Sequence, residues 1–281
     1  MIWQDPNPVN FDIFFRRSTD TGANFESVEN LSSNVRNSEI VQITVTGENV
    51  YVVWNDSLPP GNSEVFFRAS MDRGASFGAT ENLSSNAGSS DKPQISASGN
   101  NVYVVWEDDT PFPGPGEVFF RASTDLGANF AATENLSNNV GDSSVPDISA
   151  SGTNVYVVWQ DFAPGNNDLF FTRSADGGAT FDSAQNISDN SGTSRTPLLT
   201  ASVKGLYVVW TDNTAAVNSE IFFRASLPSL TPQEAIENLI QTVGDLDAVN
   251  FRVETALITQ LRIELILLAI ATYQMTLFLV R

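Results

Sequence analysis

The amino-acid sequence predicts an all-β protein: a β-propeller of four to five blades, incomplete or unusually small, with a C-terminal α-helical extension. Three observations lead to this fold class. A unit of about fifty residues recurs along the chain, as it does in propeller blades. It is marked by Trp3, Trp54, Trp106, Trp159 and Trp210. Each unit holds short segments rich in valine and aromatic residues, separated by turn residues, which is typical of strands. Before residue 228 the 3.6-residue apolar rhythm of helical repeats is absent.

Each unit predicts four antiparallel strands in a fixed order, which is the pattern of a propeller blade. The first strand is a stretch such as PQISASG, and the second is the run YVVW, which continues into W-x-D. The third holds an acid, an aliphatic residue and two phenylalanines, as in EVFF, and the fourth is a short NLS or NIS segment. The first and fourth segments occur four times and the third occurs five times. The terminal units are therefore incomplete, and the alternatives are an open arc, a piece of a longer array, or a small ring closed by a composite blade.

A turn with the pattern S-x-D-x-G-x-x-F, called the box below, follows the third strand in four units. Its aspartate is suited to accept backbone N–H groups within the turn, and its glycine to adopt a positive φ. We expect the closing phenylalanine to pack within its own blade. Because the aspartate recurs in every intact copy, we expect it to be structural rather than catalytic. The four box aspartates are Asp20, Asp72, Asp125 and Asp176.

The box, in register with W-x-D and FFR, resembles the Asp box of the bacterial neuraminidase (BNR) repeat family. The resemblance covers residues 1–226, which we predict to be a domain of propeller repeats, and leaves residues 227–281 as a separate helical segment. That family includes sialidases and many nonenzymatic propeller proteins. The resemblance therefore implies a sialidase-like fold more strongly than an activity.

A sialidase active site, as the resemblance implies it, needs arginines for the substrate carboxylate, a tyrosine nucleophile with a glutamate partner, and an aspartate acid/base. The residues directly before the first-strand prolines are Lys92, Val145 and Thr196, and none is arginine. Arg195 lies one residue earlier than Thr196, and Arg36 lies in an upstream loop. Four of the five tyrosines share one repeated strand position, which predicts a place in the core. We therefore predict no catalytic residue and a noncatalytic recognition or scaffold module, with a sialidase-like glycoside hydrolase (exo-α-sialidase type) as the alternative.

Nonrepeated residues are the better candidates for binding, and they gather in loops that we expect to open on one face. Arg36, Lys92 and Arg195 are candidates to contact an acidic sugar, and Asp109 is a further ligand-binding candidate. Asp109 ends the acidic run Glu107–Asp109, whose oxygens would suit calcium, although a solvated run is the simpler interpretation. We predict no metal and no cofactor. We expect the binding partner to be a glycan or a surface protein.

The repeated arginines have a structural explanation and a ligand-binding alternative. We expect them to pair with the recurring acids of the Asp56 and Glu64 type. They are Arg16, Arg68, Arg121 and Arg224.

The charge and the missing residue types exclude several functions. The chain has 33 acidic and 14 basic residues, a formal charge of -19, and neither histidine nor cysteine. A surface of this charge repels phosphate backbones, which argues against nucleic acid as a partner. Without cysteine and histidine there is no disulfide, no thiol nucleophile and no Ser-His-Asp triad.

The C-terminal segment has a different composition. Thr231-Pro232-Gln233-Glu234 carries the signals of a helix start, namely a capping threonine, a first-turn proline and a closing glutamate. The uncharged run Leu265–Val280 is shorter than the roughly 20 apolar residues of a membrane span. A packing helix, a membrane anchor through residues 263–280 and an abnormal terminus remain alternatives. The sequence shows no signal peptide, but its low lysine content and the resemblance predict an extracellular or cell-surface location.

Overall fold

The computed structural model describes residues 1–6, 10–58, 61–110, 114–202, 205–214 and 220–226. The chain divides into two units, residues 1–226 and 227–281, and the described residues belong to the first. Every regular element in this part is a β-strand. Accordingly, the described residues contain no helix of the length and apolarity that crossing a membrane requires. The predicted helical segment and its membrane-anchor alternative at residues 263–280 lie outside the described residues.

The strands form five antiparallel sheets, each built from consecutive strands in chain order. The first sheet holds β1 (Ile2–Pro6), β2 (Phe11–Phe15) and β3 (Glu29–Asn30). The second holds β4 (Ser38–Thr46), β5 (Asn49–Leu58), β6 (Asn62–Ser70) and β7 (Glu81–Asn82). The third holds β8 (Ser90–Ser98), β9 (Asn101–Asp108), β10 (Glu117–Ser123) and β11 (Glu134–Asn135). The fourth holds β12 (Ser143–Ser151), β13 (Asn154–Asp161), β14 (Asp168–Ser174) and β15 (Gln185–Asn186). The fifth holds β16 (Ser194–Ser202), β17 (Gly205–Asp212) and β18 (Glu220–Ser226).

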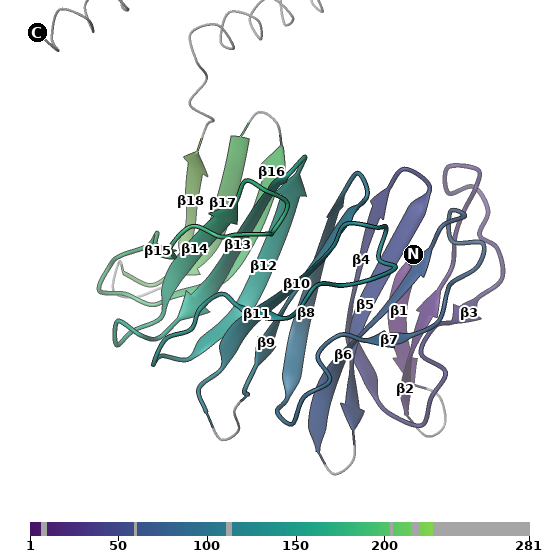
Figure 1. Ribbon diagram of the computed structural model, residues 1–281, viewed down its shortest axis with the longest axis horizontal. Coiled ribbons are helices and arrows are strands. Elements are labelled where there is room, and N and C mark those ends of the chain that lie inside the picture. Colours follow the sequence, from purple (N-terminus) through teal and green to yellow (C-terminus); the bar gives the residue numbers. More distant parts are fainter. Residues whose placement is uncertain (7–9, 59–60, 111–113, 203–204, 215–219, 227–281) are drawn as a thin grey trace, which may run out of the picture. The chain divides into compact units, whose positions relative to one another are not determined.

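The predicted four-strand unit is confirmed in the three middle sheets, and the terminal sheets have three strands each. By position in the repeat, the first sheet has no first strand and the fifth sheet has no fourth strand among the described residues. Figure 1 shows the sheets side by side in chain order, with β1–β3 at one end of the row and β16–β18 at the other.

Neighbouring sheets meet along their first strands, β4 with β8, β8 with β12, and β12 with β16. Side-chain hydroxyls join these strands: the Ala150 amide donates to Ser96 Oγ at 3.0 Å, and the Ala201 amide donates to Ser149 Oγ at 2.9 Å. The first strands therefore form the inner edge of the row, which is the arrangement of strands in propeller blades.

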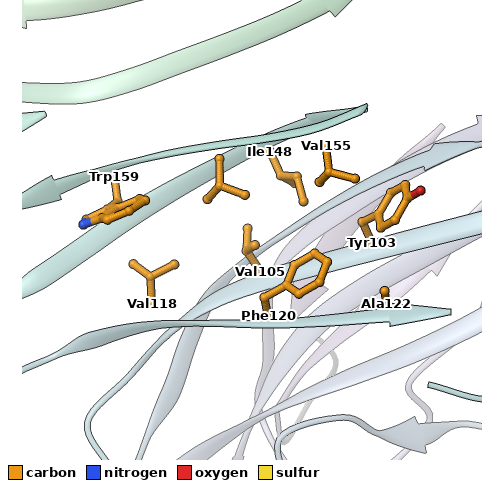
Figure 2. Close-up of a cluster of buried hydrophobic side chains, with 9 residues drawn as sticks. Tyr103, Val105, Val118, Phe120, Ala122, Ile148, Val155 and Trp159 are labelled. Atoms are coloured by element: carbon orange, nitrogen blue, oxygen red, sulfur yellow. The ribbon is translucent and has the colours of Figure 1, made fainter. Parts of the chain in front are cut away.

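The core consists of apolar layers between successive sheets. Figure 2 shows the layer between the third and fourth sheets, where Val105, Val118 and Phe120 of one sheet face Val155 and Trp159 of the next. The repeated tryptophan is fully buried in the three middle sheets. Its indole N–H donates to the aspartate two residues later, at 2.8 Å in the second sheet and 2.9 Å in the third. Residues two apart on a strand share a face, which explains the fixed W-x-D spacing.

The box turn is held by its aspartate. Asp72 Oδ1 accepts the Ser70 hydroxyl at 2.7 Å and the Ser76 amide at 2.9 Å. In the first box, hydrogen bonds from the backbone and side chain of Asn24 lower the pKa of Asp20 to about 2. The positive φ predicted for the glycines is confirmed, at 89°, 76°, 82° and 81° for Gly22, Gly74, Gly127 and Gly178.

The closing phenylalanine of the box packs differently from the prediction. Phe77 of the second sheet lies edge-on against Phe15 of the first, with ring centroids 5.0 Å apart. Phe130 contacts Phe67 of its preceding sheet in the same way, also at 5.0 Å. The phenylalanine of the box therefore packs on the preceding sheet, so the box holds two sheets together.

The expected pairing of the repeated arginines with acids of the Asp56 and Glu64 type is wrong. Arg121 donates instead to three backbone carbonyls, those of Ala131 at 2.7 Å, Phe130 at 3.0 Å and Leu83 at 3.0 Å. Leu83 belongs to the preceding sheet's fourth-strand segment, so this arginine also links two sheets. Carbonyl oxygens at a turn lack strand partners and accept guanidinium N–H groups well.

The recurring acids bind polar groups instead. Asp168 accepts Asn186 Nδ2 at 2.6 Å and the Ser188 hydroxyl at 3.2 Å. Asn186 and Ser188 belong to the NIS segment, so the recurrence of this triplet has a structural cause. Asp56 accepts Asn34 Nδ2 at 2.7 Å, and burial raises the pKa of Asp56.

Candidate functional site

The inner edge carries a repeated backbone irregularity. In each of β4, β8, β12 and β16 the pairing with the second strand shifts register at one point, which indicates a β-bulge. One residue at each bulge adopts a left-handed φ although it is not glycine. These residues are Ile40 at 48°, Lys92 at 50°, Val145 at 51° and Thr196 at 48°. Such a conformation is unfavourable for branched side chains, and strained positions of this kind concentrate at functional sites.

The residues around these bulges differ from one repeat to the next, while the adjacent tryptophan and aspartate recur. The residue before each bulge pairs across the sheet with the residue that follows the repeated tryptophan. We call these residues, with the four bulge residues, the bulge row. The pairs are Glu39 with Asn55, Asp91 with Glu107, Ser144 with Gln160, and Arg195 with Thr211.

The middle of the bulge row forms one network over three sheets. Asn55 Nδ2 donates to Asp91 Oδ1 at 2.9 Å, which joins the second sheet to the third. Glu107 Oε2 accepts Lys92 Nζ at 2.7 Å and the Val145 amide of the fourth sheet at 3.2 Å. Burial raises the pKa of Asp91, and the nearby Glu107 carboxylate acts in the same direction.

The fifth-sheet end of the row is more open. Arg195 is exposed, and within the described part of the chain its guanidinium has no hydrogen bond or ion pair. Its backbone carbonyl accepts the Thr211 hydroxyl at 3.1 Å. Phe162, which directly follows β13 and its bulge-row residue Gln160, exposes 50% of its surface. An exposed guanidinium near the start of β16 and an exposed aromatic ring just after the end of β13 thus belong to adjacent sheets.

Asp147 is a residue that the sequence reasoning missed. It lies two residues after the bulge residue Val145 on β12, where β4 and β8 have Gln42 and Gln94. Its Oδ2 accepts the Leu199 amide of β16 at 2.6 Å, and burial raises its pKa to about 6. One sequence signal could have identified this residue. Asp147 stands in PDISAS where the preceding unit has glutamine in PQISAS.

Of the four predicted ligand-binding residues, Lys92 and Arg195 belong to the bulge row, and Arg36 and Asp109 do not. The Arg36 guanidinium lies 6.0 Å from the centre of the Phe66 ring. Asp109 Oδ1 accepts the Ser89 amide, so it ties the loop after β9 to the loop before β8. Within the described ranges no group of three or more acidic side chains is arranged to hold a metal ion.

The tyrosines lie away from the row. Tyr51 and Tyr103 are fully buried and stack on Phe67 and Phe120, with centroids 6.2 and 6.3 Å apart. Tyr51 is four residues before the bulge-row residue Asn55 on β5. Tyr273 lies outside the described residues.

No family model and no curated protein matches this sequence. Among solved structures, the chain is similar to the GH93 α-L-arabinofuranosidase of Fusarium graminearum in complex with arabinobiose. The TM-score is 0.54 at 13% identity, over 80% of this chain and 76% of that one. A Trypanosoma rangeli sialidase matches with a TM-score of 0.48 at 11% identity, over 74% of this chain and 38% of that one.

These neighbours are glycoside hydrolases with β-propeller folds. At the identity of the arabinofuranosidase the likeness shows the fold alone. The chain is therefore an all-β protein of propeller-like architecture, with a polar row along the bulged inner edge of its blades.

Proposed function

We propose that this protein is a noncatalytic recognition module that binds an acidic carbohydrate along the bulge row. The observation that carries the proposal is the fifth-sheet end of the row, where the exposed Arg195 guanidinium has no partner among the described residues and Phe162 lies open just after β13 of the adjacent sheet. A guanidinium is the preferred partner of a carboxylate, and an exposed aromatic ring offers an apolar face to a sugar ring.

The remaining row residues supply hydrogen bonds of both kinds, as recognition of hydroxyl groups requires. Thr211 pairs with Arg195 across the fifth sheet, Gln160 lies two residues before Phe162, and Lys92 lies farther along the row. The propeller-like fold supports the proposal, because the similar arabinofuranosidase was solved with arabinobiose. In this proposal the protein acts outside the cell or at the cell surface, the BNR-type boxes are scaffold, and nucleic acid is not a partner.

A sialidase-like hydrolase is the second candidate, favoured by the Arg195-Thr196-Pro197 sequence at the start of an inner strand. Against it stands the position of the tyrosines, of which Tyr51 and Tyr103 are buried in the contacts between sheets. In the described part of the chain no tyrosine hydroxyl is available in the row as a nucleophile.

A glycan array probed with the full chain tests binding, and titration calorimetry on the hits tests the site. Arg195→Ala should weaken binding of a carboxylated glycan by about 10- to 100-fold, since a hydrogen bond to a charged group contributes roughly 1.5–3 kcal/mol. Arg173→Ala is the matched control, because Arg173 is also exposed but pairs with Asp182 at 2.7 Å, outside the row. Binding of no glycan, or equal losses in the two variants, would refute the proposed site. Release of a chromophore from an aryl sialoside or arabinofuranoside would refute the noncatalytic assignment.

A further inference from the structure

The fifth sheet exposes an apolar face that its counterparts bury. Ile221 and Phe223 of β18 expose 74% and 62% of their surface. The same repeat positions in the third sheet are Val118 and Phe120, which are 0% and 2% exposed because the fourth sheet covers them. We call Ile221 and Phe223, with Tyr207 and Val209 of β17, the tail face.

The first sheet exposes the opposite half of the same contact. In the three contacts among the first four sheets, the box of one sheet lies on the preceding sheet's phenylalanine. A Cβ added to Gly127 would lie 2.7 Å from the Cζ atom of Phe67, and Phe130 closes over the same ring. The first box has no such neighbour, since a Cβ at Gly22 would meet nothing within 4 Å and Phe25 is 40% exposed. We call Trp3, Gly22 and Phe25 the head face.

Three of the four contacts between successive sheets join these two kinds of face, and they share one geometry. Their aromatic pairs have centroid separations of 5.0, 5.0 and 4.9 Å and interplanar angles of 76°, 79° and 79°. The box glycine is 2.7 Å from the ring in every case, measured to the added Cβ. Residues 1–226 therefore expose, as the tail face and the head face, the two surfaces that pack against each other in these three internal contacts. The pairs are Phe15 with Phe77, Phe67 with Phe130, and Phe120 with Phe181.

We propose that the tail face of one molecule docks on the head face of a second copy, with Phe223 in the position that Phe67 occupies against Gly127 and Phe130. We choose a second copy as the occupant because of its head face, which consists of a tryptophan, a box glycine and a box phenylalanine. In the three contacts that contain a box, the same three residue types of one sheet cover the phenylalanine of the preceding sheet. The contact is heterologous, with different surfaces on the two partners, so it continues from copy to copy as a closed ring or an open filament, depending on the rotation between copies.

The strength of this contact follows from what it shares with the internal contacts and what it lacks. Arg68 and Arg121 each donate a bond across an internal contact to a fourth-strand carbonyl, at 2.9 and 3.0 Å. The tail face has no fourth strand among the described residues, so Arg16 has no equivalent acceptor there. Two copies with a formal charge of -19 each also repel one another. We therefore expect a reversible contact that salt strengthens by screening the repulsion.

Sedimentation velocity on the full chain tests the proposal. The weight-average mass should rise between about 1 and about 100 µM, the range in which contacts of modest affinity form, and it should rise further with added salt. Phe223→Glu should abolish this rise without lowering the melting temperature, because the side chain is already exposed. Val140→Glu is the matched control at a residue that is 94% exposed. A monomer at all concentrations, or a Phe223→Glu variant that associates like the wild type, would overturn the proposal.

Cross-linking tests the polarity of the contact. The chain has no cysteine, so Phe25→Cys and Phe223→Cys chains can be mixed and treated with a short bis-maleimide. The mixture should give a covalent dimer in higher yield than either variant alone. A dimer from Phe223→Cys alone, or a link within one chain carrying both substitutions, would overturn head-to-tail docking of two copies.

Discussion

Replacing Gly127 by alanine, with Gly22→Ala as its matched partner, separates two roles of the box glycine. Both glycines lie in the left-handed region, at φ 82° and 89°. They differ in surroundings, since a Cβ at Gly127 would lie 2.7 Å from Phe67 Cζ whereas a Cβ at Gly22 would meet nothing within 4 Å. The pair therefore changes the backbone conformation equally and the packing between sheets unequally.

Two free-energy costs of the alanine substitutions follow from these geometries, one from the backbone conformation and one from packing. A left-handed alanine costs roughly 1–2 kcal/mol in either box. At Gly127 the added methyl also overlaps a ring that is 2% exposed and cannot move aside, and overpacking of this kind costs roughly 1–3 kcal/mol more. The free energy of unfolding should therefore fall by about 2–5 kcal/mol in Gly127→Ala and by about 1–2 kcal/mol in Gly22→Ala.

Urea unfolding followed by tryptophan fluorescence measures both values, at a protein concentration too low for self-association. The repeated tryptophans lie within the layers between sheets and report on their separation. Equal losses in the two variants would refute the packing role of Gly127 and leave its positive φ as the only requirement.

Two further predictions follow from the buried polar groups. Arg121→Met removes three bonds to backbone carbonyls, one of which crosses to the preceding sheet, and should lower the free energy of unfolding by about 2–3 kcal/mol, allowing for partial solvent screening. Arg73→Met, at an ion pair in which the arginine is 69% exposed, should change it by less than about 1 kcal/mol. If urea unfolding gives similar losses for the two, the carbonyl bonds are not stabilising. Because burial raises the pKa of Asp147 to about 6, its protonated form is favoured in the folded state. Its contribution to stability is therefore present below the unfolded pKa and lost as the pH rises through about 6. Asp147→Asn should remove this loss, so that its stability relative to the wild type increases between pH 4 and pH 7 by up to about 3 kcal/mol. A difference that stays constant with pH would contradict this assignment.

The sequence predicts two residues of the candidate site. Lys92 and Arg195 break the repeat near the start of an inner strand, and both belong to the bulge row. Arg36 and Asp109 break the repeat as well, but one lies over Phe66 and the other binds the Ser89 amide. A sequence position beside an inner strand does not reveal whether a side chain turns toward the row or toward a neighbouring loop.

Residue types signal the bulges only in part. Proline follows Lys92, Val145 and Thr196, and proline within a strand marks an edge strand or a bulge. Ile40 has no proline after it and adopts the same left-handed φ, which is unfavourable for a branched residue. The conformation depends on the register between first and second strands, which is a property of the paired sheet.

Alternation and turn chemistry act over a few neighbouring residues, so the sequence alone predicts the repeat, the order of strands within each sheet and the box turns. Which groups meet between sheets depends on the folded arrangement. The repeated arginines bind carbonyls of the preceding sheet rather than acids, and the box phenylalanines pack on that sheet rather than on their own. The folded arrangement also decides that Phe223 is exposed while Phe67 and Phe120, in the same motif, are buried. Identical local sequences have identical preferences, and only the presence of a following sheet makes their surroundings different.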